Sequence, residues 1–354
     1  MKLRSCPKIA YERCETPENT VARLEPIIRS IHEYRYVEKK VAERLYWSAL
    51  FVDELGFRAM GKGISPVLSE AGALAESAEW LTSKETRALP GYMTGRQEEI
   101  PGALQIEDLL AHISTAAPAV LEEIKATDCA GYWADGYSLL NDRTVKVPLE
   151  FVRRIGGPNG LAAGNRLEEA ILHATLEIFE RRAQITALKN RMVMPSYDIG
   201  TIKHPVIREQ IDFIRGKGID ITVKDLSFGG ALPCIGVYFL DPNIPGDFQF
   251  HHFFKVGASF SLEHALIRAF TEYVQGRRPD EFVTGRDDDR ERVLRHDFRN
   301  LRCMPDDGDN FLSAFMFGYV PCRHAEFLRR GDVIPFEPRP ASDDCLADID
   351  NARA

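Results

Sequence analysis

The chain has 354 residues, of which 44% are hydrophobic and 28% charged, and it carries a formal net charge of −8. This length allows one large domain or two ordinary ones, with a substantial core. The negative charge argues against a general nucleic-acid-binding protein, which would usually present a basic surface.

The sequence also argues against metal-cysteine chemistry, secretion and membrane insertion. Its seven cysteines are scattered and form no C-x-x-C pair, so a zinc or redox motif is not expected. The N-terminal stretch has no apolar segment typical of a signal peptide, and no apolar run approaches the ~18 residues that a membrane span needs. We therefore expect a cytoplasmic protein that contacts neither membrane nor nucleic acid.

Strands and helices alternate along the chain without a regular strand–helix–strand repeat. Alternating or continuous apolar runs predict strands at 44–52, 144–148, 220–227 and 233–241. Helical periodicity predicts helices at 66–83, 103–125, 166–189, 205–216 and 261–275. This mixture favours an α+β fold in one domain, residues 1–334. Residues 335–354 carry prolines and acidic residues without periodicity, and we expect them to form an extended or mobile tail.

The stretch of residues 159–183, "NGLAAGN" followed by most of a predicted helix, carries four glutamates and no lysine. Asn165 is expected to be the N-cap of this helix, with Glu168 as the capping-box partner. At about 100° per residue, Glu169, Glu177, Glu180 and Arg181 fall in one stripe, opposite an apolar side that includes Leu172, Leu176, Ile178 and Phe179.

Two interpretations of the acidic stripe remain open. It could be a solvated face, but such faces normally carry a cation four residues from each carboxylate, and only Glu177 has one, Arg181. It could instead bind Mg²⁺, which takes oxygen ligands and brings substrate phosphates with it. The backbone N–H groups of residues 159–165 would then offer a phosphate site at a helix N-terminus.

Two other segments repeat this layout. Residues 61–81 place Lys62 between glycines and then Glu76 and Glu79 three apart on a small-residue helix. Residues 261–278 place Arg268, Glu272 and Gln275 along one face of a predicted helix. Gly276 is expected to end this helix as a C-cap residue. Neither glycine-rich segment fits the P-loop or the dinucleotide-binding fingerprint, so a nucleotide would be bound by another fold.

At these residues the sequence resembles the YcaO family, over about residues 10–280. The segments occur in the family's order: "GKG" with E-x-x-E, then "NG-x-x-AGN" with E-x-x-ER, then "RA-x-TE-x-x-Q". The resemblance implies a YcaO-like ATP-binding fold in which Glu76, Glu79, Glu169, Glu177 and Glu180 bind Mg²⁺. It further implies nucleotide contacts by Arg13, Thr20, Lys62, Asn165, Arg181, Arg268, Glu272 and Gln275, with Glu177, Glu180, Arg181 and Arg268 in the catalytic role.

Three positions depart from the family pattern. Gly72 stands where a serine is common, Trp80 where an arginine often follows the first E-x-x-E, and Ala162 where some members have serine. Trp80 could stack on adenine, although packing is the simpler interpretation. Cys234, in an apolar strand, is expected to be a core residue.

The resemblance implies ATP-dependent activation of a peptide backbone amide through phosphorylation of its oxygen. External sulfide would give a thioamide, with a TfuA-like partner and a sulfur donor, and this is the product we favour. A neighbouring Cys, Ser or Thr would give an azoline, with an E1-like partner; such members commonly end in a proline-rich tail, whereas this chain ends "DIDNARA". A non-catalytic scaffold and an accessory factor in ribosomal protein methylthiolation are further alternatives. We also expect a homodimer.

Overall fold

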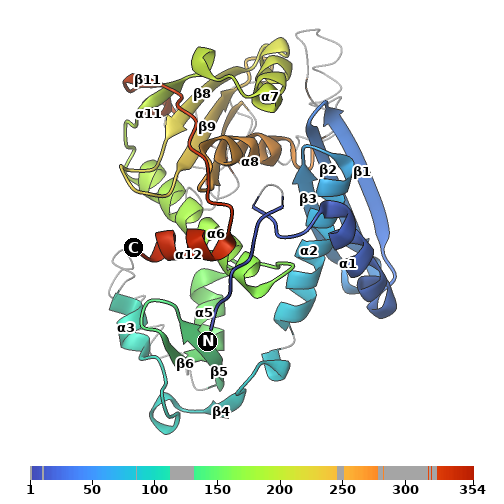
Figure 1. Ribbon diagram of the computed structural model, residues 1–354, viewed down its shortest axis with the longest axis vertical. Helices are drawn as coiled ribbons and strands as arrows, with labels where there is room; N and C mark the ends of the chain where they lie inside the picture. The colour runs from blue at the N-terminus through green and yellow to red at the C-terminus, as the bar shows by residue number, and fades with distance from the viewer. Residues whose placement is uncertain are drawn as a thin grey trace.

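The structure is a computed structural model, and it describes residues 2–9, 12–84, 86–111, 131–244, 251–277 and 325–354, with Phe282, Gly318 and Val320. Within these residues helices and strands form three sheets, which lie around one long helix, α6 (Leu167–Lys189) (Figure 1). The α+β prediction is confirmed.

The first sheet is antiparallel and consists of β1 (Arg35–Ala42), β2 (Leu45–Val52) and β3 (Phe57–Gly63). Helices α1 (Pro17–Ile31) and α2 (Pro66–Lys84) pack against it. Strand β2 is buried on both faces: Trp47 belongs to the main core, whereas Leu50 packs with α1 and α2. Trp47 and Phe51 lie on the same face of β2, and both contact the main core.

Helix α2 lies directly on β3 because both elements have glycine at the contact. A Cβ added to Gly61 would stand 1.9 Å from the Ser69 carbonyl oxygen, and one added to Gly72 would stand 3.2 Å from Gly61 Cα. A Cβ at position 72 would stand closer to β3 than ordinary van der Waals contact, so glycine there lets the helix pack directly on the strand.

The second sheet has the order β10 (His252–Ala258), β9 (Cys234–Leu240), β8 (Asp220–Asp225), β7 (Ser196–Asp198) and β11 (Val333–Pro335). Its pairs are antiparallel except β11 with β7. Helix α8 (Leu262–Val274) packs on β10 and β9 and also reaches β2, and α7 (Pro205–Gly216) packs on α8. The main core thus joins the first and second sheets.

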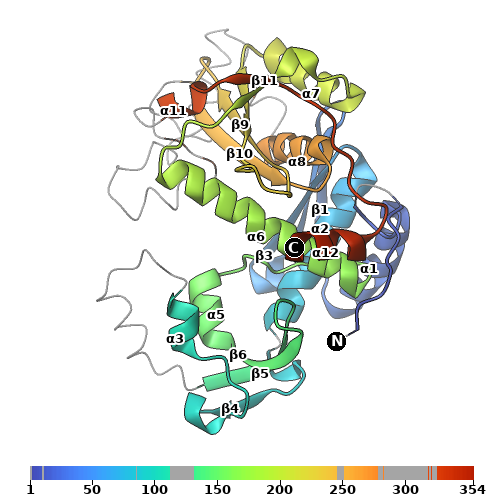
Figure 2. The same cartoon turned by 60° about the vertical axis from the view of Figure 1, so that its left-hand side comes forward.

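The third sheet lies at the other end of the molecule (Figures 1 and 2). It consists of β4 (Met93–Gly95), β5 (Gly131–Ser138) and β6 (Arg143–Pro148), with α3 (Ile106–Ala111) and α5 (Leu149–Gly156) nearby. Short 3₁₀ turns occupy Asp53–Leu55, Thr86–Ala88, Gln97–Glu99 and Ile199–Thr201.

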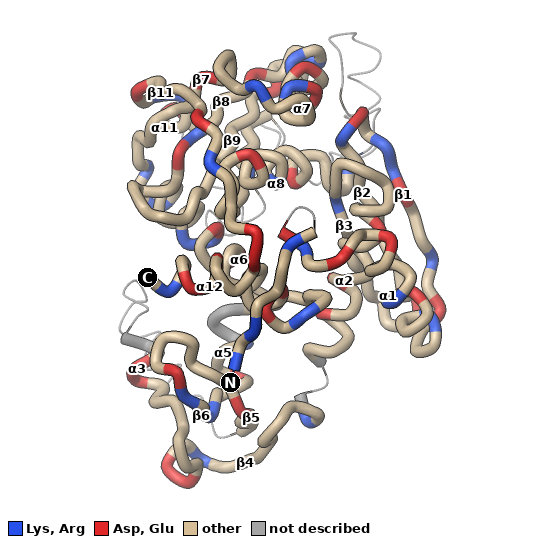
Figure 3. Tube along the Cα trace, in the orientation of Figure 1, with Lys and Arg blue, Asp and Glu red and all other residues tan. Residues whose placement is uncertain are grey.

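Nine predicted elements can be compared with the structure, and eight are present within a few residues of their expected bounds. The ninth, the helix expected at 103–125, is present as α3 only at Ile106–Ala111, and residues 112–125 lie outside the described part of the chain. No helix within the described ranges is long and apolar enough to cross a membrane. Acidic and basic residues are interspersed along β1 and α7 (Figure 3).

The prediction of an extended or mobile tail is wrong for its second half. Asp344 caps a helix, α12 (Cys345–Arg353), which packs on α6. Cys345 and Ile349 are buried, and Phe336 in the preceding stretch belongs to the main core. The helix escapes a periodicity search because it is short and only a few of its residues are apolar.

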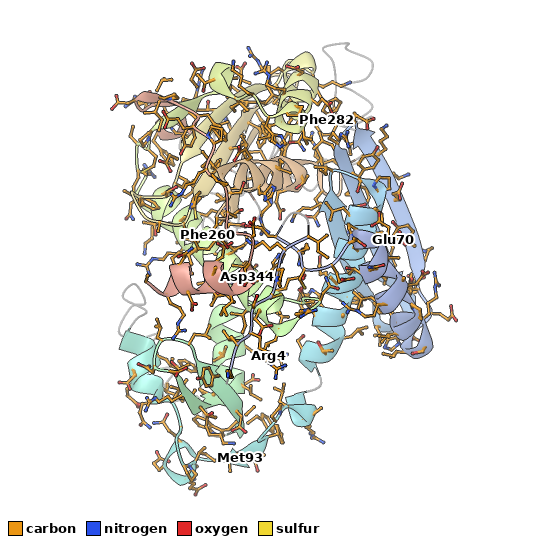
Figure 4. All side chains as sticks on the ribbon, in the orientation of Figure 1. Arg4, Glu70, Met93, Phe260, Phe282 and Asp344 are labelled. Carbon is orange, nitrogen blue, oxygen red and sulfur yellow. The ribbon has the colours of Figure 1, made fainter. Side chains whose placement is uncertain are left out.

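The tail is held by the N-terminal segment, which runs beside it (Figure 4). The Lys8 N–H donates to the Asp343 carbonyl at 2.8 Å, and the Cys345 N–H donates to the Cys6 carbonyl at 2.9 Å. The Lys8 ammonium also forms an ion pair with Asp348, whose side chain is 1% exposed. Two segments more than 330 residues apart therefore fold as one unit.

Asp348→Ala should lower the free energy of unfolding by about 3–5 kcal/mol, because it leaves the Lys8 ammonium buried without its partner. The matched control is Asp350→Ala in the same helix, where the ion pair with Arg353 is solvent-exposed and should contribute less than about 1 kcal/mol. Urea unfolding followed by circular dichroism measures both. Equal urea midpoints for the two variants would show that the buried Lys8–Asp348 ion pair contributes no more to stability than the exposed Asp350–Arg353 pair.

Candidate functional site

A group of charged side chains from separate segments meets beside α6, and we call it the charged cluster. Its members come from the N-terminal segment, β3, α2, α6, β10 and α8. Each member pairs with, or electrostatically influences, at least one other. The carboxylates are Glu76, Glu79, Glu169, Glu177, Glu180 and Glu272, and the cations are Arg13, Lys62, Arg181, Lys255 and Arg268.

Glu169, at the start of α6, binds the N-terminal segment. Its carboxylate accepts hydrogen bonds from Arg13 Nη1 and from the Cys14 N–H, both at 3.0 Å, and from the Cys14 thiol at 2.8 Å. Burial opposes ionisation of Glu169, but Arg13 and the Cys14 donors outweigh it and hold its pKa below the usual value. Glu169 therefore stays ionised although its side chain is 1% exposed.

Asn165 links the same segment to the loop before α6. Its amide donates to Glu169 at 3.2 Å, and its carbonyl oxygen accepts from the Thr20 hydroxyl at 3.1 Å. The prediction that Asn165 caps α6 is wrong, because Arg166 occupies the N-cap position. Glu168 is not its capping-box partner either, and accepts instead from the Arg4 N–H at 2.7 Å. Both side chains therefore form tertiary hydrogen bonds instead of capping the helix locally.

Two glutamates hold the glycine-rich loop. Glu79 of α2 accepts from the Ala163 N–H at 2.5 Å, and Glu177 of α6 accepts from the Gly160 N–H at 3.2 Å. The sequence analysis predicted that these N–H groups would bind phosphate, and in the structure they donate to carboxyl oxygens. A phosphate oxygen would meet the same donors after either carboxylate moved.

Burial raises the pKa values of Glu76, Glu79 and Glu177, the last two being within range of each other's charge. For Glu79 the value rises to about 7. Three partly buried carboxyl groups that resist ionisation are favourable neighbours for a cation, because a bound positive charge would restore their ionised forms.

Arginines from two helices pair with Glu180. Arg268 Nη2 of α8 lies 3.4 Å from its carboxylate, and Arg181 Nη1 lies 4.0 Å away. The Nε atoms of both arginines are buried and make no hydrogen bond within the described chain. Each guanidinium therefore has donor capacity left for an incoming oxyanion, which suits a phosphate.

Glu272 of α8 lies between two lysines. One carboxylate oxygen pairs with Lys62 of β3 and the other lies 3.8 Å from the Lys255 ammonium of β10. Burial opposes ionisation, but the two lysines outweigh it and lower the pKa of Glu272 to about 2. Gln275 donates to the Met60 carbonyl at 3.3 Å and fixes the end of α8 against β3.

The site fits a phosphate-bearing ligand with a divalent cation, because its arginine donors suit the phosphate and its carboxylates suit the cation. Nowhere in the described ranges do three or more His, Cys, Asp or Glu residues stand ready to ligate one ion. A cation would therefore complete its coordination with phosphate oxygens and water. Mg²⁺ commonly binds in this way, through one or two carboxylates plus substrate phosphates.

The structure excludes the interpretation of the acidic stripe as a solvated face. Glu169 and Glu180 are 1% and 4% exposed, so the stripe faces the protein interior rather than solvent. The expected apolar side is correct for Leu172 and Leu176, which are fully buried, and wrong for Ile178 and Phe179, which are 55% and 38% exposed. The buried stripe is polar because its partners are cations from other segments.

All thirteen predicted site residues lie in or against the charged cluster, and Lys255 is the member that the sequence analysis missed. It is the only lysine in the otherwise apolar or aromatic strand β10, and burial lowers its pKa. A single cation in a buried strand is a usable sequence signal. Trp80 packs with Phe57 at 6.4 Å between ring centroids, and Cys234 is 3% exposed, as expected of core residues.

The fold and the cluster together define an α+β protein equipped to bind a metal–phosphate ligand. The family model described as YcaO cyclodehydratase, ATP- and Mg²⁺-binding, matches residues 60–354. The chain belongs to the YcaO family, and ATP and Mg²⁺ are the ligands of that family.

Individual relatives match parts of the chain. The ribosomal protein S12 methylthiotransferase accessory factor YcaO of Escherichia coli is 30% identical over 143 residues, 39% of this chain and 23% of that protein. A protein from the tfuA 3′ region of Rhizobium leguminosarum is 25% identical over 288 residues, 75% of this chain and 67% of that protein.

Two solved structures share the fold. A heterocyclase in complex with substrate and cofactor has a TM-score of 0.68 at 21% identity, covering 99% of this chain and 50% of that one. YcaO from Methanopyrus kandleri, bound with AMPPCP and Mg²⁺, has a TM-score of 0.64 at 17% identity, covering 98% of this chain and 84% of that one.

The raised pKa of Glu79 should make folding stability depend on pH. The folded chain keeps the Glu79 proton up to about pH 7, whereas the unfolded chain releases it near the ordinary value of 4.5. The free energy of unfolding should therefore fall as pH rises through this interval, and Glu79→Gln should remove that part of the fall.

Urea midpoints measured below, within and above the interval test this, with Glu18→Gln on the exposed face of α1 as the control. Identical pH dependence in wild type and Glu79→Gln would show that Glu79 titrates normally.

Proposed function

We propose that this protein activates a peptide backbone amide by transferring the γ-phosphoryl group of ATP to the amide oxygen, with Mg²⁺. The observation that carries the proposal is the meeting of six carboxylates and five cations from distant segments, with buried arginine donors left over. Membership of an ATP- and Mg²⁺-binding family supports it.

The reaction forms an O–P bond between the amide oxygen and the γ-phosphorus, and it breaks the bond from the γ-phosphorus to the β–γ bridging oxygen, so that ADP leaves. A nucleophile adds to the amide carbon, and the C–O bond then breaks with phosphate as leaving group. Phosphate leaves far more readily than the oxide that an unactivated amide would release. Mg²⁺, when bound, neutralises phosphate charge and aligns the transferring group.

The protein's own residues divide this work. Arg181 and Arg268 would bind the oxygens of the transferring phosphoryl group through their free donors. Glu180 would keep both guanidinium groups in place. Glu177 and Glu79, which hold the glycine-rich loop, are the carboxylates best placed to share the cation, with Glu76 and Glu169 as further predicted ligands.

Lys62 and Lys255, fixed by Glu272, add positive charge on the far side of the cluster. Arg13, Thr20 and Asn165 order the N-terminal segment against α6 and would contact the remainder of the nucleotide. These assignments follow from the observed pairings and from the order of the family's motifs.

We favour a thioamide as the product, formed with an external sulfide source and a TfuA-like partner. The relative encoded in a tfuA region supports this choice, and it matches a larger share of this chain than the E. coli accessory factor does.

An azoline-forming cyclodehydratase is the second candidate, and the structural likeness to a heterocyclase favours it. An E1-like protein would then be the expected partner. The match to the E. coli accessory factor keeps a role in ribosomal protein methylthiolation, or as a nucleotide-binding scaffold, as a third candidate.

Purified protein should release phosphate slowly from Mg²⁺–ATP, and Glu177→Gln or Glu180→Gln should reduce the rate by about 100-fold or more, because each removes charge that orders the transferring group. Glu209→Gln, on the exposed face of α7 and 48% exposed, is the matched control. Circular dichroism establishes that each variant is folded. Wild-type rates of phosphate release in both Glu177→Gln and Glu180→Gln would contradict the assignment of the site.

Mass spectrometry of a peptide incubated with protein, Mg²⁺–ATP and sulfide distinguishes the products. Exchange of one oxygen for sulfur gives the mass gain expected of a thioamide, whereas loss of one water indicates an azoline. If peptides encoded by the neighbouring genes stay unmodified in the presence of every co-encoded partner, the result would support the scaffold candidate instead.

A further inference from the structure

A hollow lies on a side of α6 next to the charged cluster, and none of its lining residues belongs to that cluster. It has a volume of about 300 Å³ and lies between the second half of α6 and the connection from β8 to β9. In Figure 2 this half of α6 runs beneath the second sheet. We call it the side-chain pocket.

The floor of the side-chain pocket is apolar and its walls are aromatic. Leu226, Cys234 and Ala183 line it and are at most 5% exposed. Phe179 of α6 and Phe228 of the connecting loop line it as well, yet they are 38% and 43% exposed. Two exposed phenylalanines beside a buried apolar floor form a surface suited to an apolar group.

The loop holds Phe228 in an unfavourable backbone conformation. Its φ is +50°, a region that non-glycine residues rarely adopt, and Gly229 follows at +74°. The Ser227 hydroxyl accepts from the Cys234 N–H at 3.1 Å and the Ser227 carbonyl accepts from the Gly230 N–H at 2.8 Å, so the turn is fixed at both sides. Strain that presents an aromatic ring to solvent is typical of ligand-contacting loops.

A cation without a partner completes the pocket. Arg182 lines it, is exposed, and makes no ion pair or hydrogen bond with any described residue. Its neighbours one turn away along α6 are Ile178, Phe179, Ile185 and Thr186, so the helix offers no carboxylate to pair with it. The pocket is thus complementary to an apolar group that has a negative charge beside it.

The pocket adjoins the charged cluster through its floor. Ala183 lies less than one helical turn from Glu180 on α6. Burial and then the charge of Glu180 raise the pKa of Cys234 to about 12, which places Glu180 within electrostatic range of the floor. A chain seated in the pocket would continue toward the arginines that pair with Glu180.

We propose that the side-chain pocket binds one aromatic or long aliphatic side chain of the peptide substrate, and that Arg182 binds a carboxylate on the adjacent residue. The volume is at the lower limit of ligand pockets, which suits one amino-acid side chain better than a nucleotide. This inference rests on the proposed function, because it assigns the pocket to the peptide whose amide is activated at the cluster. Binding of that side chain in the pocket would determine which backbone amide of a longer peptide reaches the charged cluster.

The test uses fluorescein-labelled hexapeptides and fluorescence anisotropy, which needs no catalysis. Gly-Gly-Phe-Asp-Gly-Gly should bind the full-length protein at least about tenfold more tightly than Gly-Gly-Phe-Lys-Gly-Gly or Gly-Gly-Ala-Asp-Gly-Gly. Arg182→Glu should reverse the preference for Asp over Lys. Ala231→Leu, which fills the exposed rim of the pocket, should weaken the Phe-Asp peptide to the affinity of the Ala-Asp peptide.

Arg215→Glu, an exposed charge reversal at the end of α7, is the matched control and should keep the wild-type preference. Equal binding of the three peptides, or a preference that survives both pocket variants, would overturn the inference. Phosphate release in Glu177→Gln is measured separately, so failure of the proposed function and failure of the pocket give different results.

Discussion

Ion pairs that bury carboxylates between cations from distant segments organise the centre of this protein. Lys62 of β3 meets Glu272 of α8, and Arg268 of α8 meets Glu180 of α6. Removing such charges from water is costly unless each finds its partner, so the pairs form only when the strands and helices that carry them are in place. The same pairs leave the arginine Nε donors free. The site is therefore organised before any ligand arrives, which is the condition for strong electrostatic stabilisation of a transferring phosphoryl group.

Glycines let the charged side chains reach one another. A Cβ on Gly257 of β10 would stand 2.1 Å from the Ala265 carbonyl oxygen of α8, and one on Gly164 would stand 2.4 Å from the Ala170 nitrogen of α6. Together with the contact of Gly61 and Gly72, these positions place three helices directly against their neighbours. Side chains of ordinary length then span the remaining gap. The small residues beside each acidic motif are therefore part of the site's geometry, although they bear no charge.

Periodicity predicted helices α2, α6, α7 and α8, and the resemblance to a family with these ordered motifs implied which charged residues meet, but α1 and α5 were not predicted. The sequence could not predict the partner of each side chain. Asn165 and Glu168 fit a local cap, yet the N-terminal segment offers Thr20 and the Arg4 N–H, and these tertiary contacts replace the capping pattern. The helix α12 was missed for a related reason. Its stability depends on the buried Asp348 and on a strand-like segment at the opposite end of the chain, which no local window contains.

Helix α6 buries a carboxylate stripe together with apolar residues such as Leu172 and Leu176, and it leaves other apolar residues exposed. Its carboxylate stripe is buried because cations from other segments pair with it, whereas Ile178, Phe179 and Ile185 are 55%, 38% and 39% exposed. Exposed apolar residues on a helix whose polar side is already buried gain nothing for folding. The proposed contact of the exposed side with a substrate chain would explain them. In the proposed arrangement, one helix carries both a wall of the side-chain pocket and Glu180 with Arg181, so it would fix the distance between the bound side chain and the activated amide.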